Sequence, residues 1–339
     1  MMRPTIALAM GDPAGISPEL TARLLALDDV AANARLVVIG DRRVLDDGAR
    51  IAAVQLDLKN VSSDADFSGG KDPVFIDLGH LDPSTVKTGT ATTEGGRFAL
   101  TNYRHALRLA HDGRAEAVCF TPFNKKAMRL AHPVYDDEIS FSAGVVGLKG
   151  PASEFNVLGG LWNARVTSHI SLAEVAARIT HDAVLRALRL TDDSMRVAGF
   201  ERPRIAVAGL NPHAGDGGNF GREEIDAIEP AVQQARADGI ATEGPFPADT
   251  VFLRAKSGAF DAVLTMYHDQ GQIAMKLMGF DRGVTLLGGF DFPICTPAHG
   301  TAYEIAGRGI ADIGAARAAV LLAAEMAQAK RKRAATAAA

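Results

Sequence analysis

Short apolar runs alternate with helical patterns along most of the chain. The apolar runs predict β-strands at 5–10, 35–39, 73–78, 117–121, 165–168, 204–208 and 262–266. Several are apolar throughout, as expected of parallel strands that are covered on both faces. Between them the pattern predicts helices at 17–27, 93–111, 172–178, 182–190, 222–238 and 313–328. The first of these helices has a capping residue, Ser17, followed by Pro18.

This alternation predicts an α/β protein with a mainly parallel sheet. Chains longer than about 250–300 residues usually form more than one domain, and this chain has 339 residues. We expect a first domain that comprises residues 1–120 together with 290–339, and a second domain that comprises residues 121–289. No internal repeat or low-complexity linker marks the boundaries, which are therefore approximate.

Composition excludes several classes of protein. Hydrophobic residues make up 47% of the chain, charged residues 22%, and the formal net charge is −4. This balance does not favour a nucleic-acid partner, which would require a basic stripe. No apolar stretch is long enough for a signal peptide or a membrane span. Neither cysteine belongs to a CxxC pair, so we expect a reduced, cytoplasmic protein with no membrane partner.

Three histidines closely follow predicted strands. His169 follows the run at 165–168, His213 lies in a Gly- and Pro-rich loop after 204–208, and His268 follows 262–266. In α/β proteins, ligands bind at the carboxyl ends of strands. One such histidine alone is more often a surface residue than a ligand. Three favour a divalent metal, because imidazole binds first-row metals and three ligands leave positions open for a substrate.

Two glycine-containing segments could bind a nucleotide. Gly11 and Asp12 lie between the first strand and the first helix, where free N–H groups attract anions. This segment matches neither GxGxxG nor a P-loop, and a ligand-free tight turn fits it equally well. His299 and Gly300 precede a short helix expected to start near Thr301. They could offer a ring and N–H groups to a nucleotide, although a simple helix cap is the alternative.

Taken together, the motifs of the chain resemble those of the 4-hydroxythreonine-4-phosphate dehydrogenase family, in order from about residue 4 to residue 328. The matching segments are Gly-Asp-Pro-Ala-Gly at 11–15, Asn124-Lys125, Thr-Ser-His at 167–169, Asn-Pro-His-Ala-Gly at 211–215, Pro-Ala-Asp-Thr at 247–250, Tyr-His-Asp-Gln-Gly at 267–271, Lys276 and His-Gly-Thr at 299–301.

The resemblance implies the fold of the isocitrate and isopropylmalate dehydrogenases, with two α/β domains and a cleft between them. It implies a homodimer in which His169, His213 and His268 bind one divalent metal, one of them supplied by the partner subunit. Zn²⁺ is the expected metal, with Ni²⁺, Co²⁺, Mn²⁺ or Mg²⁺ as alternatives. NAD would bind in the first domain, at the segments that hold His299-Gly-Thr and Gly11-Asp12.

The chemistry that the resemblance implies is oxidation of a secondary alcohol β to a carboxylate, often followed by loss of CO₂. A metal bound to the alcohol oxygen lowers its pKa and assists proton loss as hydride leaves to NAD. The same metal stabilises the enolate that forms on decarboxylation. Lys276, Asp249 and Asp269 are candidates for the proton relay, and the sequence does not rank them.

The chain departs from phosphate-using members of the family at several substrate positions. They carry Gly-His-Thr-Glu where this chain has Asp-Glu-Ile-Ser at 137–140, so an acid, Glu138, replaces an imidazole. Their asparagine is Thr285 here, and their arginine is Cys295. Losing an arginine–phosphate contact and adding an acid disfavours a dianionic phosphate. Arg165, predicted on the same strand face as His169, could hold a carboxylate instead, and Lys125 is a further candidate for substrate binding.

We therefore expect a small hydroxy acid without phosphate, such as an aromatic cis-dihydrodiol carboxylate like that of terephthalate. The alternative substrate is 4-hydroxythreonine 4-phosphate or threonate or erythronate 4-phosphate. A second alternative is that the protein is not an enzyme but a relative that binds a ligand through its metal.

Overall fold

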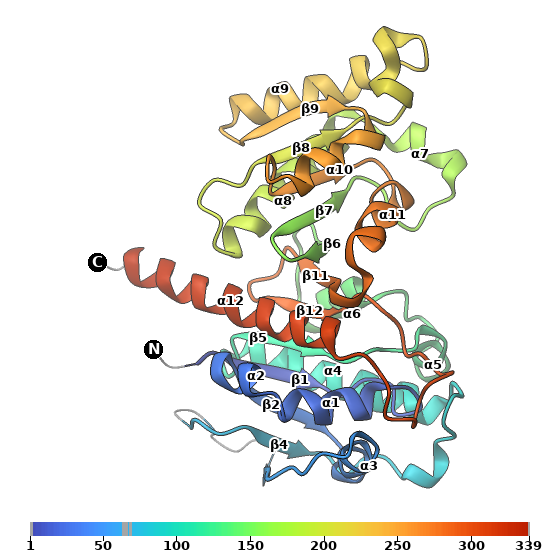
Figure 1. The fold of residues 1–339 in the computed structure, drawn as a ribbon, viewed down its shortest axis with the longest axis vertical. Coiled ribbons are helices and arrows are strands. Elements are labelled where there is room, and N and C mark those ends of the chain that lie inside the picture. The colour runs from blue at the N-terminus through green and yellow to red at the C-terminus, as the bar shows by residue number, and fades with distance from the viewer. Residues whose placement is uncertain (1–2, 63–66, 68–69, 338–339) are drawn as a thin grey trace. The chain divides into compact units, whose positions relative to one another are not determined.

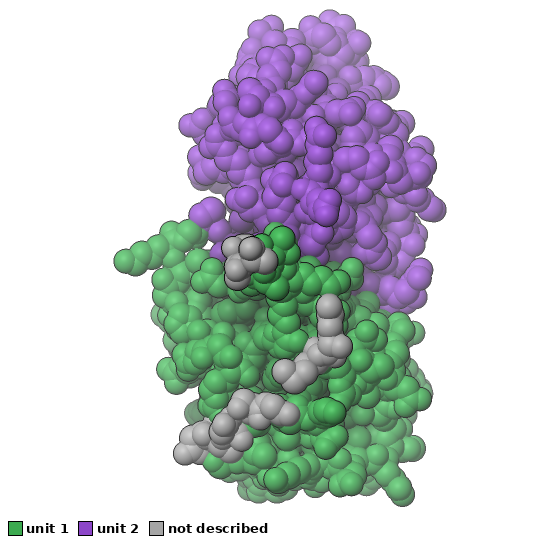
Figure 2. Space-filling model, turned by 90° about the vertical axis from the view of Figure 1, so that its left-hand side faces the viewer, with its two compact units in different colours: residues 1–150, 290–339 green, residues 151–289 purple. Residues whose placement is uncertain are grey.

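The computed structural model describes residues 3–62, 67 and 70–337. These residues form two compact units (Figure 2). Unit 1 comprises residues 1–150 and 290–339, and unit 2 comprises residues 151–289. Strands and helices alternate in both units, which confirms the predicted α/β class. Among the described helices, none has the length and apolar character needed to cross a membrane.

The sheet of unit 1 is parallel throughout the described residues. Its strands lie in the order β3-β4-β2-β1-β5-β12. Their bounds are β1 Thr5–Ala9, β2 Arg35–Gly40, β3 Lys59–Val61, β4 Val74–Asp77, β5 Ala117–Phe120 and β12 Ile294–Pro297. The central strands are buried along their whole length because helices cover both faces, as their apolar runs predicted.

The helices of unit 1 form two groups (Figure 1). One group packs together on one face of the sheet, and it comprises α1 Ser17–Leu25, α2 Asp28–Asn33, α3 Arg42–Ala52 and α12 Gly314–Ala337. The other group covers the opposite face, and it comprises α4 Thr93–His111, α5 Lys125–Ala131 and α6 Glu138–Val146. A single 3₁₀ turn lies at Pro83–Thr85.

Residues 121–150 belong to unit 1, whereas the sequence placed them in the second domain. The reason is an apolar cluster in which Leu100 of α4, Met128 of α5 and Tyr135 are buried together. The hydroxyl groups of Tyr103 and Ser142 also form a hydrogen bond of 2.5 Å that ties α4 to α6. The strand pattern alone could not show these contacts between helices.

The sheet of unit 2 is mixed. Its strands lie in the order β11-β6-β7-β10-β8-β9, in which β6 is antiparallel to β11 and β7 and the remaining pairs are parallel. Their bounds are β6 Ser153–Leu158, β7 Leu161–Arg165, β8 Ile205–Ala208, β9 Thr242–Phe246, β10 Ala262–Thr265 and β11 Val284–Gly288.

Unit 2 also contains five α-helices among its described residues. They are α7 Leu172–Arg178, α8 His181–Val197, α9 Glu229–Ala237, α10 Ala248–Lys256 and α11 His268–Gly279. Shorter helical segments lie at Pro212–Gly218, Glu224–Ile228 and Phe280–Arg282, the second of them a π-helix. Val251 and Phe252 of α10 share a buried apolar cluster with Met275 of α11 and Val263 of β10.

The prediction of a strand at 165–168 was wrong. β7 ends at Arg165, where the prediction began, because a two-residue turn at Gly159 and Gly160 joins β7 to β6 as an antiparallel hairpin. Thr167 lies after the strand, and its hydroxyl donates to the carbonyl of Met266 at 2.8 Å. The short helix expected near Thr301 is likewise absent from the described residues, where 303–307 form turns.

Replacing Met128 with alanine tests the packing that joins residues 121–150 to unit 1. Met128 is fully buried, so Met128→Ala should lower the free energy of unfolding by about 2–5 kcal/mol through lost burial and a cavity. Leu130→Ala on the same helix is the control, because Leu130 is 48% exposed. Equal effects in urea titrations would contradict the proposed anchoring.

Candidate active site

Loops that carry the three histidines leave neighbouring parallel strands of unit 2. β10 pairs in parallel with β7 on one side and with β8 on the other. His169 follows β7, His213 follows β8, and His268 begins α11 just after β10. The ring centroids of His169 and His268 are 5.7 Å apart. Parallel pairing thus brings these two histidines together, as their strand-end positions predicted.

A carboxylate orients the ring of His268. The Nδ1 atom of His268 lies 2.6 Å from Oδ1 of Asp269. This contact favours the tautomer with the proton on Nδ1 and leaves Nε2 as the free lone pair, which is the usual arrangement of a metal-binding histidine. His268 is half-buried and His169 is exposed, so both rings are accessible to a ligand.

His213 lies in a loop with an unusual backbone. The φ angles of the five residues from His213 to Gly217 are all positive, between 46° and 82°. Three of these residues are not glycine, and this conformation costs each of them on the order of 1 kcal/mol. The ring of His213 lies 6.2 Å from that of Phe220. A strained loop of this kind persists only where surrounding contacts hold it.

Glu224 supplies those contacts. Its side chain is buried, and Oε1 accepts the backbone N–H groups of Leu210 and Asn211 at 2.7 and 2.8 Å. Its Oε2 accepts from the amide of Asn211 at 2.9 Å. The sequence analysis missed this residue, because only the fold places a helical glutamate beneath the loop.

The donor set fits a divalent metal in part. His169 and His268 are adjacent imidazoles, and the carboxylate of Asp269 contacts one of them, which suits Zn²⁺ and similar ions. Within the described residues of this single chain, no group of three His, Cys, Asp or Glu side chains could hold a metal ion. A third ligand would therefore have to come from His213 after a movement of its loop, or from a second copy of the chain.

The other candidates in unit 2 occupy exposed or half-buried positions. Asp249 lies in the first turn of α10, and Lys276 lies on α11, the helix that His268 begins. Thr285 is half-buried on β11. Their roles in proton transfer and substrate binding stay predictions.

Arg165 has partners within the protein. Its side chain is 1% exposed, and its guanidinium donates to Glu154 of β6 at 2.6 Å and to Asn156 at 2.9 Å. The free guanidinium expected to hold a substrate carboxylate is therefore already paired. The reason is the β6–β7 hairpin, which sets Glu154 opposite Arg165.

At the carboxyl edge of the unit 1 sheet, the loop after β1 packs against the loop after β5. The N–H of Gly11 lies 2.8 Å from the hydroxyl of Ser17 and 2.9 Å from that of Thr121, and the N–H of Asp12 donates to Pro122 at 3.0 Å. A Cβ atom on Gly11 would lie 2.2 Å from the carbonyl oxygen of Thr121. These N–H groups are therefore not free for a nucleotide, and glycine is required here for close packing.

The side chain of Asp12 holds the loop that follows β12. The hydroxyl of Tyr303 donates to Oδ2 of Asp12 at 2.5 Å, and the N–H of Ala14 donates to Oδ1 at 2.9 Å. Burial raises the pKa of Asp12, while these two hydrogen bonds oppose the rise. Asp12 thus links the Gly-Asp-Pro-Ala-Gly turn to the segment predicted to bind the nucleotide.

Helix α1 holds the C-terminal part of the segment 301–311 in place. The buried carboxylate of Glu19 accepts the N–H groups of Gly309 and Ala311 at 2.9 and 3.0 Å. Arg23 donates to the carbonyl oxygens of the same two residues. Neither Glu19 nor Tyr303 was predicted as a site residue, because the sequence does not show that α1 packs against 301–311.

Within this segment, His299 and Gly300 are the accessible groups. His299 is half-buried, with Nδ1 3.0 Å from the carbonyl of Gly300, and Gly300 is exposed. Thr301 is buried, and its carbonyl accepts the N–H of Ile16 at 3.0 Å. The ring of His299 and the backbone of Gly300 are therefore accessible, and their role in nucleotide binding stays a prediction.

Two substrate candidates of unit 1 have contrasting surroundings. Glu138 lies 3.4 Å from the amine of Lys125, so its charge is offset. Cys295 is fully buried on β12, in register with Cys119 of β5, and burial raises its pKa. The prediction that Cys295 contacts substrate is therefore not supported in this chain, because its thiol lies within the sheet.

The chain is thus a two-unit α/β protein with ligand-accessible loops at the carboxyl ends of its strands, and proteins of this architecture are known. A solved 4-hydroxythreonine-4-phosphate dehydrogenase from Klebsiella pneumoniae is 34% identical, with a TM-score of 0.82 over 96% of this chain and 100% of that one. A terephthalate 1,2-cis-dihydrodiol dehydrogenase from Burkholderia xenovorans is 30% identical, with a TM-score of 0.66 over 95% and 98%.

Sequence comparison defines the family. The model of the pyridoxal phosphate biosynthetic protein PdxA matches residues 32–323. A protein of Rhizobium meliloti, provisionally named 4-hydroxythreonine-4-phosphate dehydrogenase 2, is 65% identical over 99% of this chain and 97% of its own length. The chain belongs to the PdxA family, which confirms the resemblance found in its motifs.

Replacing Glu224 with glutamine tests the support of the His213 loop. An amide accepts hydrogen bonds without the assistance of a negative charge, which is worth about 1–2 kcal/mol. The N–H groups of Leu210 and Asn211 should therefore exchange with deuterium about tenfold faster in Glu224→Gln. Glu223→Gln is the matched control, since Glu223 accepts only the side-chain amide of Asn211 among the described contacts. Unchanged exchange in Glu224→Gln would show that other contacts hold the loop.

Proposed function

We propose that this protein is a metal- and NAD-dependent dehydrogenase that oxidises a secondary alcohol β to a carboxylate in a phosphorylated four-carbon hydroxy acid. 4-Hydroxythreonine 4-phosphate is the first candidate, and threonate or erythronate 4-phosphate is the alternative. The observation that carries the proposal is the pairing of His169 with His268 at neighbouring strand ends. It occurs in a PdxA-family chain whose 65% identical relative is provisionally named 4-hydroxythreonine-4-phosphate dehydrogenase 2.

The choice of a phosphorylated substrate reverses the expectation from sequence. That expectation depended on the arginine replaced by Cys295, on Arg165 as a carboxylate-binding group and on Glu138 as an added acid, and the structure changes the last two. Arg165 is paired with Glu154, and Glu138 is paired with Lys125. The relation to the Klebsiella enzyme is also closer than that to the terephthalate dihydrodiol enzyme, with TM-scores of 0.82 and 0.66. Both comparisons support the phosphorylated acid.

The residues of the chain can perform most of the positioning that the reaction needs. His169 and His268 would hold a divalent cation, and Asp269 would keep the Nδ1 proton on His268. Lys276 and Asp249 are the candidates that take and return protons at the substrate hydroxyl and carbon. Lys125 would orient an anionic group of the substrate. Asp12 and Glu19 would act through the 301–311 segment, by fixing the backbone that carries His299.

When bound, the cation would polarise the substrate hydroxyl and NAD would accept the hydride. The β-keto acid product would then lose CO₂, because the electrons of the broken C–C bond can move into the adjacent ketone. The protonated amine of Lys276 could return a proton to the carbon that loses CO₂. Decarboxylation is part of this proposal.

We further propose that the active form is a homodimer in which a second copy of the chain completes the metal site. The incomplete ligand set supports this, since His169 and His268 lie together and the described part of one chain places no third ligand beside them. Sedimentation of the purified protein should show a dimer. A monomer that turns over substrate at full rate would contradict this proposal.

Measuring NADH formation against a substrate panel tests the function. The panel comprises 4-hydroxythreonine 4-phosphate, threonate 4-phosphate, their unphosphorylated forms and terephthalate cis-dihydrodiol, each with and without added Zn²⁺ or Mn²⁺. We expect the phosphorylated acids to be preferred in kcat/KM on the order of a hundredfold or more, because a site built for a charged group rejects analogues that lack it. A preference for the unphosphorylated acids would contradict this proposal and support the substrate without phosphate that the sequence predicted.

His268→Ala should lower kcat/KM by about 10–100-fold or more, because a metal ligand is lost. The matched control is His181→Ala. His181 also begins a helix, and its Nδ1 also lies close to the next aspartate, at 3.0 Å. This exposed pair should tolerate the change within about twofold. Ligand binding that depends on the metal, without any turnover of the panel, would instead indicate a non-catalytic relative.

A further inference from the structure

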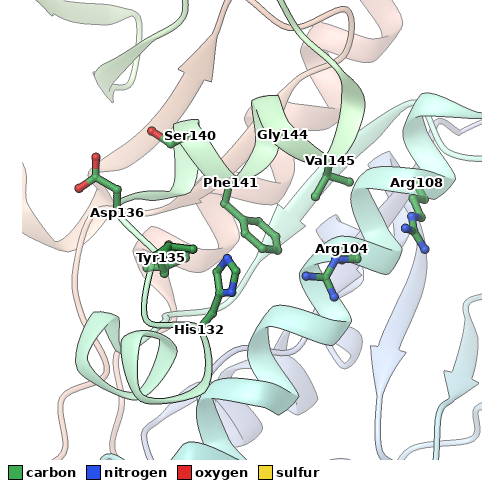
Figure 3. A pocket seen from close by; sticks show the side chains of 10 residues that line it. Arg104, Arg108, His132, Tyr135, Asp136, Ser140, Phe141, Gly144 and Val145 are labelled. Atoms are coloured by element: carbon green, nitrogen blue, oxygen red, sulfur yellow. The ribbon is translucent and has the colours of Figure 1, made fainter.

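Unit 1 contains a cavity that none of the predicted site residues lines. It has a volume of about 370 Å³ and lies between helix α4, helix α6 and the segment that joins α5 to α6 (Figure 3). Its lining residues are Arg104, Arg108, His132, Val134, Tyr135, Asp136, Ser140, Phe141, Gly144 and Val145. The volume is within the range of small-molecule sites, which is about 300–1,000 Å³.

The wall formed by α4 is positively charged. Arg104 and Arg108 are one helical turn apart and so point to the same side, as Figure 3 shows. Within the described residues neither guanidinium has an ion pair or a hydrogen bond, although arginines elsewhere in the chain commonly pair with acids. The guanidinium of Arg104 lies 5.3 Å from the ring centroid of Phe141. Asp136 is the one carboxylate in the lining, so the cavity carries an excess of positive charge.

A buried tyrosine hydroxyl belongs to the residues that line the same cavity. Tyr135 is 4% exposed, and among the described residues its hydroxyl oxygen makes no hydrogen bond of good geometry, although the carboxylate of Glu138 lies nearby. Burial, first, and that carboxylate raise the pKa of Tyr135, so the group stays protonated and can donate a hydrogen bond. A ligand oxygen in the cavity would offer this hydroxyl an acceptor of better geometry.

One side of the cavity is apolar, and the helices around it are fixed. Phe141 and Val145 of α6 line one side, and Val134, which is 81% exposed, lies at the rim. The hydrogen bond between Tyr103 and Ser142 holds α6 on α4, and the ring of Tyr103 stacks on Phe141 with centroids 5.7 Å apart. The cavity is therefore preformed, which reduces the entropy lost when a ligand binds.

From these features we propose that the cavity between α4 and α6 binds a small organic anion, with its carboxylate or phosphate at Arg104 and Arg108 and its apolar body against Phe141. A bare inorganic anion would leave the apolar wall unused, and a neutral aromatic would leave both guanidinium groups unpaired. The site goes beyond the proposed dehydrogenase function, since Arg104, Arg108 and Phe141 are not among the predicted substrate, metal or NAD residues.

The probe for this proposal is 4-bromobenzoate, which combines a carboxylate with an apolar ring. Its binding to the full chain is measured by calorimetry, and its position is found from the anomalous signal of bromine in a crystal. The double variant Arg104→Gln/Arg108→Gln should weaken binding about tenfold or more, because two charge-assisted contacts are lost. The control Arg202→Gln/Arg236→Gln removes the same charge from exposed positions of unit 2 and should leave the affinity unchanged.

Tyr135→Phe separates a ligand role from a structural one. Its hydroxyl makes no hydrogen bond of good geometry among the described residues, so this variant should unfold at a nearly unchanged temperature. It should nevertheless bind the probe several-fold more weakly. Inorganic phosphate forms the second arm, and it should bind more weakly than 4-bromobenzoate.

Several outcomes would overturn the proposal. They are equal probe affinity in wild type and Arg104→Gln/Arg108→Gln, bromine located outside the cavity, no detectable binding, or phosphate binding more tightly than the aromatic acid. Turnover of the phosphorylated substrates should be unchanged in the arginine variant without probe. A failure of the dehydrogenase proposal therefore leaves this test intact.

Discussion

The parallel pairing of β10 with β7 and with β8 is the constraint on which the candidate metal site depends. Parallel strands direct their carboxyl ends to one edge, so the loops after all three must leave the sheet side by side. His169 and His268 lie together for this reason, although about a hundred residues of sequence separate them. Without that register, their motifs would be three unrelated turns.

Buried carboxylates hold the loops that follow these strands in place. Glu224 accepts two backbone N–H groups beneath the His213 loop, and Glu19 accepts two in the 301–311 segment. Two charge-assisted N–H bonds offset part of the cost of burying a carboxylate. Each unit therefore positions its accessible groups through an acid that needs no contact with any ligand. Glycine at position 11 serves the same end by letting two loops touch.

Much of this organisation could be predicted from local pattern. The helix at 93–111 was predicted with the bounds that α4 has, and the runs at 35–39, 117–121 and 262–266 correspond closely to strands. Strand-end histidines were recognisable because polarity changes abruptly after an apolar run. These features depend only on residues near one another in sequence.

The sequence pattern could not show which residues, far apart in the sequence, contact one another in the fold. Arg165 looked free because β6, which brings Glu154 opposite it, was not recognised. Cys295 looked accessible because β12 is too short to show strand periodicity. Residues 121–150 were assigned to the wrong domain because the apolar cluster around Met128 is formed by three separate helices. The expectation of an unphosphorylated substrate lost support at Arg165, because burial and pairing decide which side chains remain available.

The discontinuity of unit 1 has a consequence for the order in which the protein forms during translation. Unit 2 is one continuous segment, so all its strands emerge from the ribosome before residues 290–339 exist. Until then β5 lacks its neighbour β12, and the sheet face that α12 covers stays open to water. An uncovered edge strand can pair with other chains. Unit 2 can therefore complete its fold first, and the sheet of unit 1 closes only after β12 and α12 have been synthesised.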